Sequence, residues 1–357
     1  MQALDFIMGH PLLRALVMSI GIVTVVMTTC AWAIWFERKL AGRMQNRLGP
    51  TLVGPAGLLQ PIADAIKLLR KEPLVPKDAD AFLFRLAPPL TVFFTLAGLA
   101  AIPWSDTLWI ADLDIGILWV LAMAGLMLLP IWIAGWASNN KYALFGGMRA
   151  VAQGISYEIP LLLSAMVPVV LAGSLNLREI VHHQMAHGWF ALWPPGIGLI
   201  AFIVFFTTSL AEANRIPFDV PEAESELIAG VSIEYTAMNY GLLPMAEYVH
   251  TLIASAVASV LFLGGWDGPF LDATWYDGVG WMLLKTGGLF TFIYLFRWSL
   301  VRFRADQLMH FCWIWLVPGT LVLVLAAAVW VQIMPTAAAG AAEIAAPVAA
   351  PMLPAGK

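Results

Sequence analysis

Apolar residues along this chain gather into long runs that short charged segments separate. Runs of about 20 residues, the length that crosses a bilayer, occur eight times. Pro and Gly interrupt several runs, which membrane helices tolerate when neighbouring groups satisfy the freed backbone. The pattern predicts an all-α membrane protein with about eight transmembrane helices. We place them at residues 15–36, 86–104, 115–136, 148–172, 190–211, 239–265, 279–297 and 311–333.

One segment between the first two runs has the periodicity of a helix, with one apolar side and one charged side. Residues 57–72 read GLLQPIADAIKLLRKE. On a helical wheel, Leu58, Ile62 and Leu69 share one side, whereas Asp64 and Lys67 share the other. The segment is too short and too charged to span, so we expect an amphipathic helix on the cytoplasmic membrane surface.

The remaining organisation follows from where the apolar runs stop. Residues 1–334 are expected to form a single polytopic membrane domain, with an acidic cytoplasmic loop at about 212–238. Residues 335–357 are mostly Ala, Pro and Gly without apolar periodicity, which predicts a disordered tail.

Composition supports the bilayer as the solvent of this surface. Only 12% of the residues are charged and 61% are hydrophobic, whereas soluble domains carry about 25% charged residues. The net charge of -4 is not the excess of positive charge that is typical of nucleic-acid-binding proteins. Cys30 and Cys312 lie in separate apolar runs, with no CxxC or Cys/His cluster. We therefore expect no metal ion, no iron–sulfur cluster and no disulfide framework on this chain.

The basic residues predict the orientation of the spans. Of the 19 Lys and Arg residues, 15 fall in the first, third, fifth and seventh loops or at their helix ends. This bias places those loops in the cytoplasm and both termini in the periplasm. The 15 residues are Arg38, Lys39, Arg43, Arg47, Lys67, Arg70, Lys71, Lys77, Arg85, Lys141, Arg149, Arg215, Arg297, Arg302 and Arg304.

Acidic residues at unusual depths are the strongest chemical signal. Glu158 and Glu247 fall inside predicted spans, where an ionised carboxylate costs at least a few kcal/mol unless it is paired or hydrated. Between them, residues 210–248 interleave acids with apolar residues around Arg215. This pattern predicts a proton path from a cytoplasmic cavity into the membrane; the alternative for any single acid is that it caps a helix or pairs with Arg149 or Arg215. The path would consist of Glu158, Glu212, Glu222, Glu224, Glu226, Glu234 and Glu247.

The first loop carries the second candidate site. Arg38, Arg47 and Asp64 are suited to line a cavity for a lipid-soluble ligand with a polar head, and the amphipathic helix would form one lip of its portal. The alternative is a positively charged membrane anchor with turns, which we prefer for Lys39 and Lys77.

Five long motifs of this sequence resemble those of a known protein family. The chain resembles the H subunits (subunit 1 in mitochondria) of proton-translocating NADH:quinone oxidoreductase, respiratory complex I. The matching stretches are FERKLAGRMQNRLGP at 36–50, GLLQPIADAIKLLRKE at 57–72, GWASNNKYALFGGMRAVAQGISYEIP at 135–160, LAEANRIPFDVPEAESELIAGVSIEYTAMNYGLLPMAEY at 210–248 and RADQLMHFCWIWLVP at 304–318.

The resemblance implies a membrane subunit that forms a quinone chamber and links quinone reduction to proton translocation. The chamber would open near the first span, the amphipathic helix and the sixth span, and the seven glutamates would connect quinone chemistry to the pumps. No residue of this chain alone would be catalytic, because the quinone head is reduced in neighbouring soluble subunits. Carried onto this sequence, the quinone-binding candidates are Glu37, Arg38, Arg47, Asp64, Arg215, Phe218 and Asp219.

The same resemblance implies cofactors, partners and location. A quinone, expected to be ubiquinone, is the substrate, and no cofactor is permanently bound. NADH and FMN would bind elsewhere because the chain has no GxGxxG loop. Partners would be soluble quinone-site and iron–sulfur subunits on the cytoplasmic side, small and antiporter-like membrane subunits, and the lipid of a bacterial inner membrane.

Two other functions stay open from the residues. A homologous anchor subunit of a membrane-bound hydrogenase-type complex needs no quinone, and the intact ERK…RMQNRLGP loop favours the quinone enzyme. A stand-alone proton-coupled transporter also uses intramembrane acids. The long apolar and acidic fifth loop suits a surface that a partner covers, which disfavours the transporter.

Overall fold

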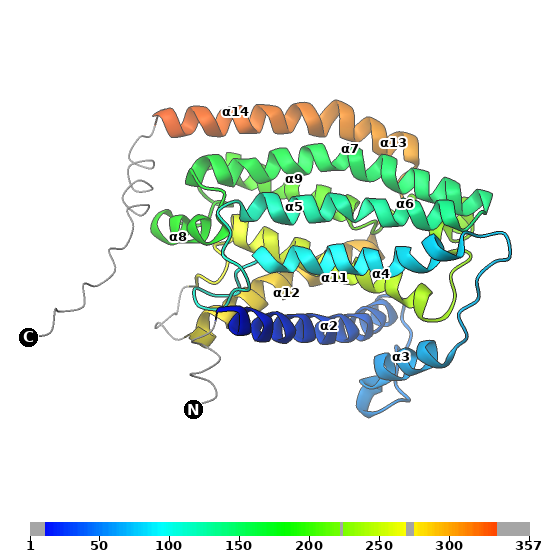
Figure 1. Cartoon of the computed structure of the whole chain (residues 1–357). Helices are drawn as coiled ribbons and strands as arrows, with labels where there is room; N and C mark the ends of the chain where they lie inside the picture. The colour runs from blue at the N-terminus through cyan, green and yellow to red at the C-terminus, as the bar shows by residue number, and fades with distance from the viewer. Residues whose placement is uncertain (1–10, 222–223, 269–274, 334–357) are drawn as a thin grey trace, which may run out of the picture.

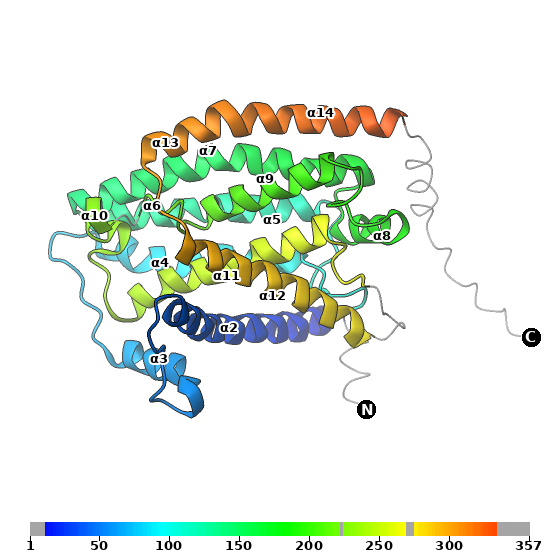
Figure 2. The same cartoon turned by 180° about the vertical axis from the view of Figure 1, so that it is seen from behind.

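The computed structural model describes residues 11–221, 224–268 and 275–333. These residues form helices and connecting turns but no β-strand. The long helices run alongside one another in a single bundle (Figure 1 and, from behind, Figure 2). The predicted all-α membrane fold is thereby confirmed.

Within the described residues, seven helical segments are long and apolar enough to cross a membrane, and each matches a predicted span. The eighth predicted span, 190–211, corresponds to a shorter apolar helix, α9 (Ile197–Glu212). The seven are α2 (Pro11–Met44), α4 (Ala81–Gly98) with a short 3-10 turn, α5 (Gly116–Leu126) with α6 (Leu128–Ala137), α7 (Lys141–Ala172), α11 (Ala237–Phe262), α12 (Trp275–Ser299), and α13 (Ala305–His310) with a π-turn and α14 (Val317–Ile333).

Several helices extend beyond the ends predicted for their spans, among them α2 and α7. The first was expected to end at residue 36, but α2 continues to Met44 and therefore carries Glu37 and Arg38. The fourth was expected to start at residue 148, but α7 starts at Lys141, after the side chain of Asn140 caps it by accepting the Tyr142 N–H. A charged residue ends the apolar run that predicts a span, because its charge limits how deep it lies in lipid. It does not end the helix, since Arg and Lys are good helix formers.

The short helix α9 makes room for a buried loop. Its 16 residues rise about 24 Å at about 1.5 Å per residue, less than the roughly 30 Å of a hydrocarbon core. The helix starts only after Pro194, Pro195 and Gly196, and it ends at Glu212. The non-helical segment 213–221 that follows is almost wholly buried. Non-helical backbone inside a membrane protein is tolerated where protein encloses it.

Gln153 of α7 supplies the hydrogen bonds that this buried loop needs. Its Nε2 donates to the carbonyl oxygens of Ala211, at 2.7 Å, and of Phe218, at 2.6 Å. The side chain is 1% exposed. A buried carbonyl without a donor costs free energy, so Gln153 holds both ends of the loop against α7.

Helix α11 lies at the centre of the bundle. It packs against α2, α3, α4, α9 and α12, and 83% of its most apolar window is buried, against 17% for the segment Ala305–Ile333. In Figure 1, α14 lies along one outer side of the bundle and α2 along the other. Side chains on α11 can therefore reach groups from several spans.

The two ends of the bundle carry different short helices. Helix α3 (Gln60–Arg70) lies within the predicted amphipathic range 57–72 and packs against α2 and α11. It leaves Ile62, Ile66 and Leu69 exposed, which suits a helix in a membrane interface. Helices α3 and α10 (Glu224–Leu227) lie at one end, and α8 (Leu177–His187) lies at the other (Figures 1 and 2).

Replacing Gln153→Leu should destabilise the protein, because two buried carbonyl groups lose their donor at a cost of about 1–3 kcal/mol each. Thermal unfolding of the purified protein in mild detergent measures the effect. Gln332→Leu, on an exposed position of α14, is the control and should leave the melting temperature unchanged. Equal melting temperatures for both variants would show that Gln153 does not hold the loop.

Candidate functional site

Four charged side chains meet in the interior of the bundle and form two ion pairs. The Oε1 atom of Glu37 on α2 lies 2.6 Å from Nη1 of Arg297 on α12. The Nη2 atom of Arg215, in the buried loop, lies 3.6 Å from Oε2 of Glu247 on α11. Glu37 and Arg215 are 4% and 3% exposed. Opposite charges offset much of the cost of burial, and we call these four residues the central charge cluster.

Tyr248 joins the two ion pairs. Its hydroxyl donates a hydrogen bond to Oε2 of Glu37, and its ring lies 4.5 Å from Cζ of Arg215. A guanidinium over an aromatic face is attracted by the ring quadrupole. The ring of Tyr294 on α12 lies nearly parallel to that of Tyr248, with centroids 6.1 Å apart. One residue therefore contacts both the acid of the first pair and the base of the second.

The Arg215 guanidinium is charged but loosely held. Burial opposes its charge, yet Tyr294, Glu247, Tyr248 and Glu37 together raise its pKa above the ordinary value. Its separation from Glu247 exceeds a hydrogen-bond distance, and Nε and Nη2 have no hydrogen-bond partner within the described part of the chain. An ion pair at this spacing can be bridged by water.

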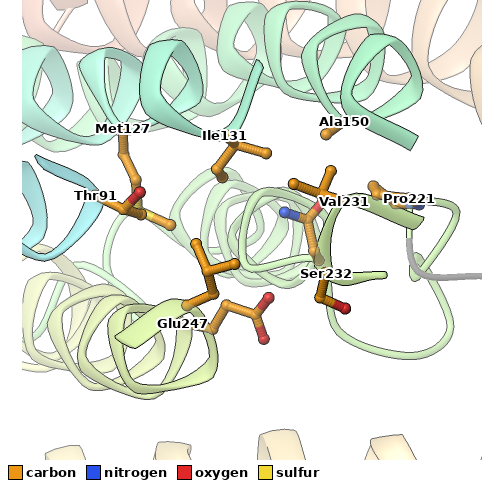
Figure 3. Close-up of a pocket in the computed structure, with 10 residues that line it drawn as sticks. Thr91, Met127, Ile131, Ala150, Pro221, Val231, Ser232 and Glu247 are labelled. Atoms are coloured by element: carbon orange, nitrogen blue, oxygen red, sulfur yellow. The ribbon is translucent and has the colours of Figure 1, made fainter. Parts of the chain in front are cut away.

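A small cavity lies beside Glu247. Its volume is about 30 Å³, enough for a water molecule. Figure 3 shows the Glu247 carboxylate at the edge of this cavity, with apolar side chains such as Met127, Ile131 and Val231 on other sides. Thr91 and Ser232 add hydroxyl groups to the lining. A water molecule there would have polar partners and could carry a proton to or from Glu247.

A larger pocket lies between α2, α3 and α11, and we call it the lateral pocket. Its volume is about 350 Å³. Its polar groups are Arg38 and Asp64, whose Nη1 and Oδ2 atoms lie 2.6 Å apart, together with Tyr240 and Tyr248. The rest of the lining is Met27, Cys30, Ala31, Ile34, Pro61, Ala65, Leu68, Met238, Gly241, Pro244 and Met245. The pocket is therefore mostly apolar, and through Tyr248 it touches the central charge cluster.

Two further acids come from α7 and α9. Glu158 of α7 packs against Gly125 of α5 so closely that a Cβ added to Gly125 would lie 2.4 Å from its Oε1. Glu212 at the end of α9 is 8% exposed and close enough to Glu158 for their charges to interact. Its Oε2 lies 3.9 Å from Nε2 of His250 on α11. Acids from α7, α9 and α11 thus lie in sequence across the bundle.

The remaining proton-path candidates lie apart from these buried acids. Glu226 is half exposed and pairs with Arg149 of α7. Glu234 accepts a hydrogen bond of 2.6 Å from Nδ2 of Asn140. Glu222 lies outside the described residues, and so does the side chain of Glu224.

The quinone-binding candidates divide among separate places. Glu37 and Arg215 belong to the central charge cluster, whereas Arg38 and Asp64 line the lateral pocket. Arg47 is exposed and donates from Nε to Oε1 of Gln45, 2.6 Å away. It is not part of the pocket lining.

Phe218, which precedes Asp219 in the chain, lines a second, aromatic pocket of about 400 Å³ at the end of α9. The ring of Phe218 packs against Tyr157 and Phe303, with both centroid distances at 5.7 Å. Oδ2 of Asp219 lies 2.8 Å from Nη2 of Arg302. Burial raises the pKa of Asp219 above its ordinary value, although Arg302, Arg297 and Arg215 act to lower it.

Sequence reasoning missed three members of the site. The sequence pattern indicates only a cytoplasmic positive charge at Arg297, and it does not single out Tyr248 or His250. A signal existed for the last two, because residues 247–250 occupy one turn of a predicted span and combine an acid, a phenol and an imidazole. Among the residues described, no group of three or more His, Cys, Asp or Glu side chains could hold a metal ion.

Comparison with known proteins identifies relatives over most of the chain. A family model described as NADH dehydrogenase matches residues 17–328. The H subunit of NADH-quinone oxidoreductase from Dehalococcoides mccartyi is 48% identical over 288 residues, which cover 81% of this chain and 78% of the relative. The protein of the same name from Geobacillus thermodenitrificans is 46% identical, over 85% of this chain and 90% of the relative. The corresponding figures for Burkholderia vietnamiensis are 42%, 90% and 92%.

Replacing Arg297→Met should destabilise the protein strongly, because breaking a buried ion pair typically costs about 3–5 kcal/mol. The double variant Arg297→Met, Glu37→Gln should recover part of this loss of stability, since it also removes the negative charge of Glu37 that Arg297→Met leaves without its partner. Thermal unfolding of the purified protein measures both.

Arg149→Met is the matched control, because it breaks a partly exposed pair whose loss costs about 1 kcal/mol or less. If Arg297→Met and Arg149→Met lower the melting temperature equally, Glu37 does not depend on Arg297.

Proposed function

Because the chain belongs to the NADH dehydrogenase family, whose members include the H subunits of NADH-quinone oxidoreductase, we propose that its lateral pocket and central charge cluster form its share of a quinone chamber. The chain is a membrane subunit of this enzyme, respiratory complex I. The names of its relatives favour this function over a hydrogenase-type anchor or a stand-alone transporter.

One observation carries the proposal: Tyr248 lines the lateral pocket and also donates a hydrogen bond to Glu37. Ligand sites are mostly apolar, with a few polar groups that fix orientation. Apolar side chains from α2, α3 and α11 suit the tail of a quinone, and the guanidinium of Arg38 can donate hydrogen bonds to its carbonyl oxygens. The expected quinone is ubiquinone.

The loosely held pair of Arg215 and Glu247 supports coupling between the pocket and a proton path. Quinone reduction adds charge and takes up protons. A change of charge near Glu37 or Tyr248 acts on Arg215, which contacts Tyr248 and is attracted by Glu37. If Arg215 moves toward that change, Glu247 loses its counter-charge and the protonated form of its carboxyl becomes more favourable.

The buried acids continue this path across the bundle. From Glu247, a proton would pass to Glu212 and then to Glu158, which lie on α11, α9 and α7. Glu222, Glu224, Glu226 and Glu234 would connect the path to the aqueous side. The contacts between helices place acids from distant parts of the sequence close together.

The bias of basic residues supports an orientation in the membrane. The chain is a multi-pass bacterial membrane protein. The end that carries α3 and α10 would face the cytoplasm, with both termini in the periplasm. Soluble quinone-site and iron–sulfur subunits would cover that end, while small and antiporter-like membrane subunits would contact the sides of the bundle.

Arg38→Ala should weaken quinone-site inhibitors about tenfold, as expected for the loss of one charged hydrogen bond worth about 1.4 kcal/mol or more. Inhibitor titration of NADH-dependent quinone reduction in membranes measures this. NADH oxidation by artificial acceptors should not change.

Arg47→Ala is the matched control, because Arg47 does not line the lateral pocket. A similar loss of inhibitor binding in both variants would contradict the placement of the quinone site. Loss of both activities in Arg38→Ala would indicate failed assembly.

Glu247→Gln and Glu226→Gln should each lower quinone reductase activity without preventing assembly. The larger loss is expected for Glu247, because it is mostly buried beside Arg215, whereas water can replace part of the role of the half-exposed Glu226. Glu179→Gln on α8, at the opposite end of the bundle, is the control. Normal turnover in both test variants would remove these acids from the mechanism.

A further inference from the structure

We propose that His250 relays protons between Glu212 and Glu247. This inference rests on the proposed function, because it adds a residue to the proton path through α11. His250 is a buried imidazole of a membrane-embedded helix and is 4% exposed. A proton path that consists of the glutamates alone gives this residue no role.

The position of His250 fits a relay between two helices. It lies three residues after Glu247 on α11, and residues at this spacing are neighbours on one side of a helix. Its Nε2 atom lies 3.9 Å from Oε2 of Glu212 on α9. A small side-chain rotation or one intervening water molecule would close this gap to hydrogen-bond distance.

The neighbouring charged groups single out the imidazole as the carrier. Glu212, Glu247 and Arg215 are charged groups beside this part of α11. Arg215 lies close to both His250 and Glu247, but a guanidinium does not release its proton in proteins. A group that lies between the two carboxylates and both accepts and donates a proton can carry the proton from one to the other. An imidazole does both through its two nitrogens.

The relay step conserves charge and atoms. A proton leaves the Glu247 carboxyl and binds Nδ1 of His250, directly or through water, and the proton on Nε2 then passes to the Glu212 carboxylate. One proton moves, no electron moves, and the ring resets by exchanging its tautomer. Within the described part of the chain, Nδ1 of His250 is buried without a hydrogen-bond partner. The cavity beside Glu247 (Figure 3) can hold a water molecule next to this carboxylate.

The alternative is that His250 only fills space in the core of the bundle. A glutamine there keeps much of the volume and the hydrogen-bonding capacity but cannot carry a proton at neutral pH. The two roles therefore predict different results for His250→Gln. A space-filling role leaves turnover and proton yield near normal, whereas a relay role lowers both.

The test uses the complete enzyme in inverted membrane vesicles. His250→Gln is compared with His183→Gln, which removes another buried imidazole, on α8 at the opposite end of the bundle. All rates are divided by NADH–ferricyanide activity, which counts assembled complexes. The readouts are inhibitor-sensitive quinone reduction, proton uptake per quinone reduced, and the rate ratio in H₂O and D₂O.

We expect His250→Gln to lower quinone reduction per assembled complex at least about tenfold, because a positioned acid–base group typically contributes about 10²–10⁴-fold. We also expect a larger solvent isotope effect, with His183→Gln near wild type. Normal turnover, proton yield and isotope effect in His250→Gln would overturn the relay, as would an equal loss in His183→Gln.

Two reference variants distinguish a failure of the His250 relay from a failure of the proposed proton path. If Glu212→Gln and Glu247→Gln lower coupled turnover but His250→Gln does not, only the relay fails. If neither glutamate variant changes coupled turnover, the proposed proton path itself fails.

Discussion

The pairing of buried charges is the constraint on which the rest of this structure depends. An ionised side chain inside an apolar bundle is costly unless an opposite charge lies beside it. Glu37 with Arg297 and Arg215 with Glu247 meet this condition only because α2, α11, α12 and the loop after α9 converge at one place. The short helix α9 and the hydrogen bonds of Gln153 to the buried loop are what bring Arg215 there.

The two pairs differ in the distance between their charged atoms. Glu37 is held by Arg297 at 2.6 Å and by the hydroxyl of Tyr248. Glu247 lies 3.6 Å from Arg215, beside a cavity that can hold water. In the proposed mechanism, Glu37 positions the pocket side of the cluster, whereas Glu247 exchanges a proton. Because Tyr248 contacts both pairs, the same proposal has changes in the lateral pocket reach Glu247 through this side chain.

Much of the fold could be predicted from the sequence, because long apolar runs require a bilayer whatever their neighbours are. Seven of the eight predicted spans match long apolar helices. The pattern could not predict that α9 is short or that residues 213–221 are buried, because hydropathy does not report which segments protein encloses. It placed Glu158 and Glu247 inside spans and named Arg149 and Arg215 as possible partners of the acids. It could not predict that Arg297 pairs with Glu37, since these residues lie far apart in the sequence. For the same reason it could not separate the half-exposed Glu226 from Glu158 and Glu247.

Photolabelling of the assembled enzyme with an azido-quinone shows directly whether quinone enters the lateral pocket. We expect adducts, prevented by an excess of quinone, on α2 between Met27 and Arg38, on α3, and on α11 between Met238 and Tyr248, because these segments line the lateral pocket. Protected adducts confined to the aromatic pocket around Phe206, Phe296 and Phe311 would contradict it. In that case the quinone would reach the enzyme on the far side of α9, and the lateral pocket would have another role.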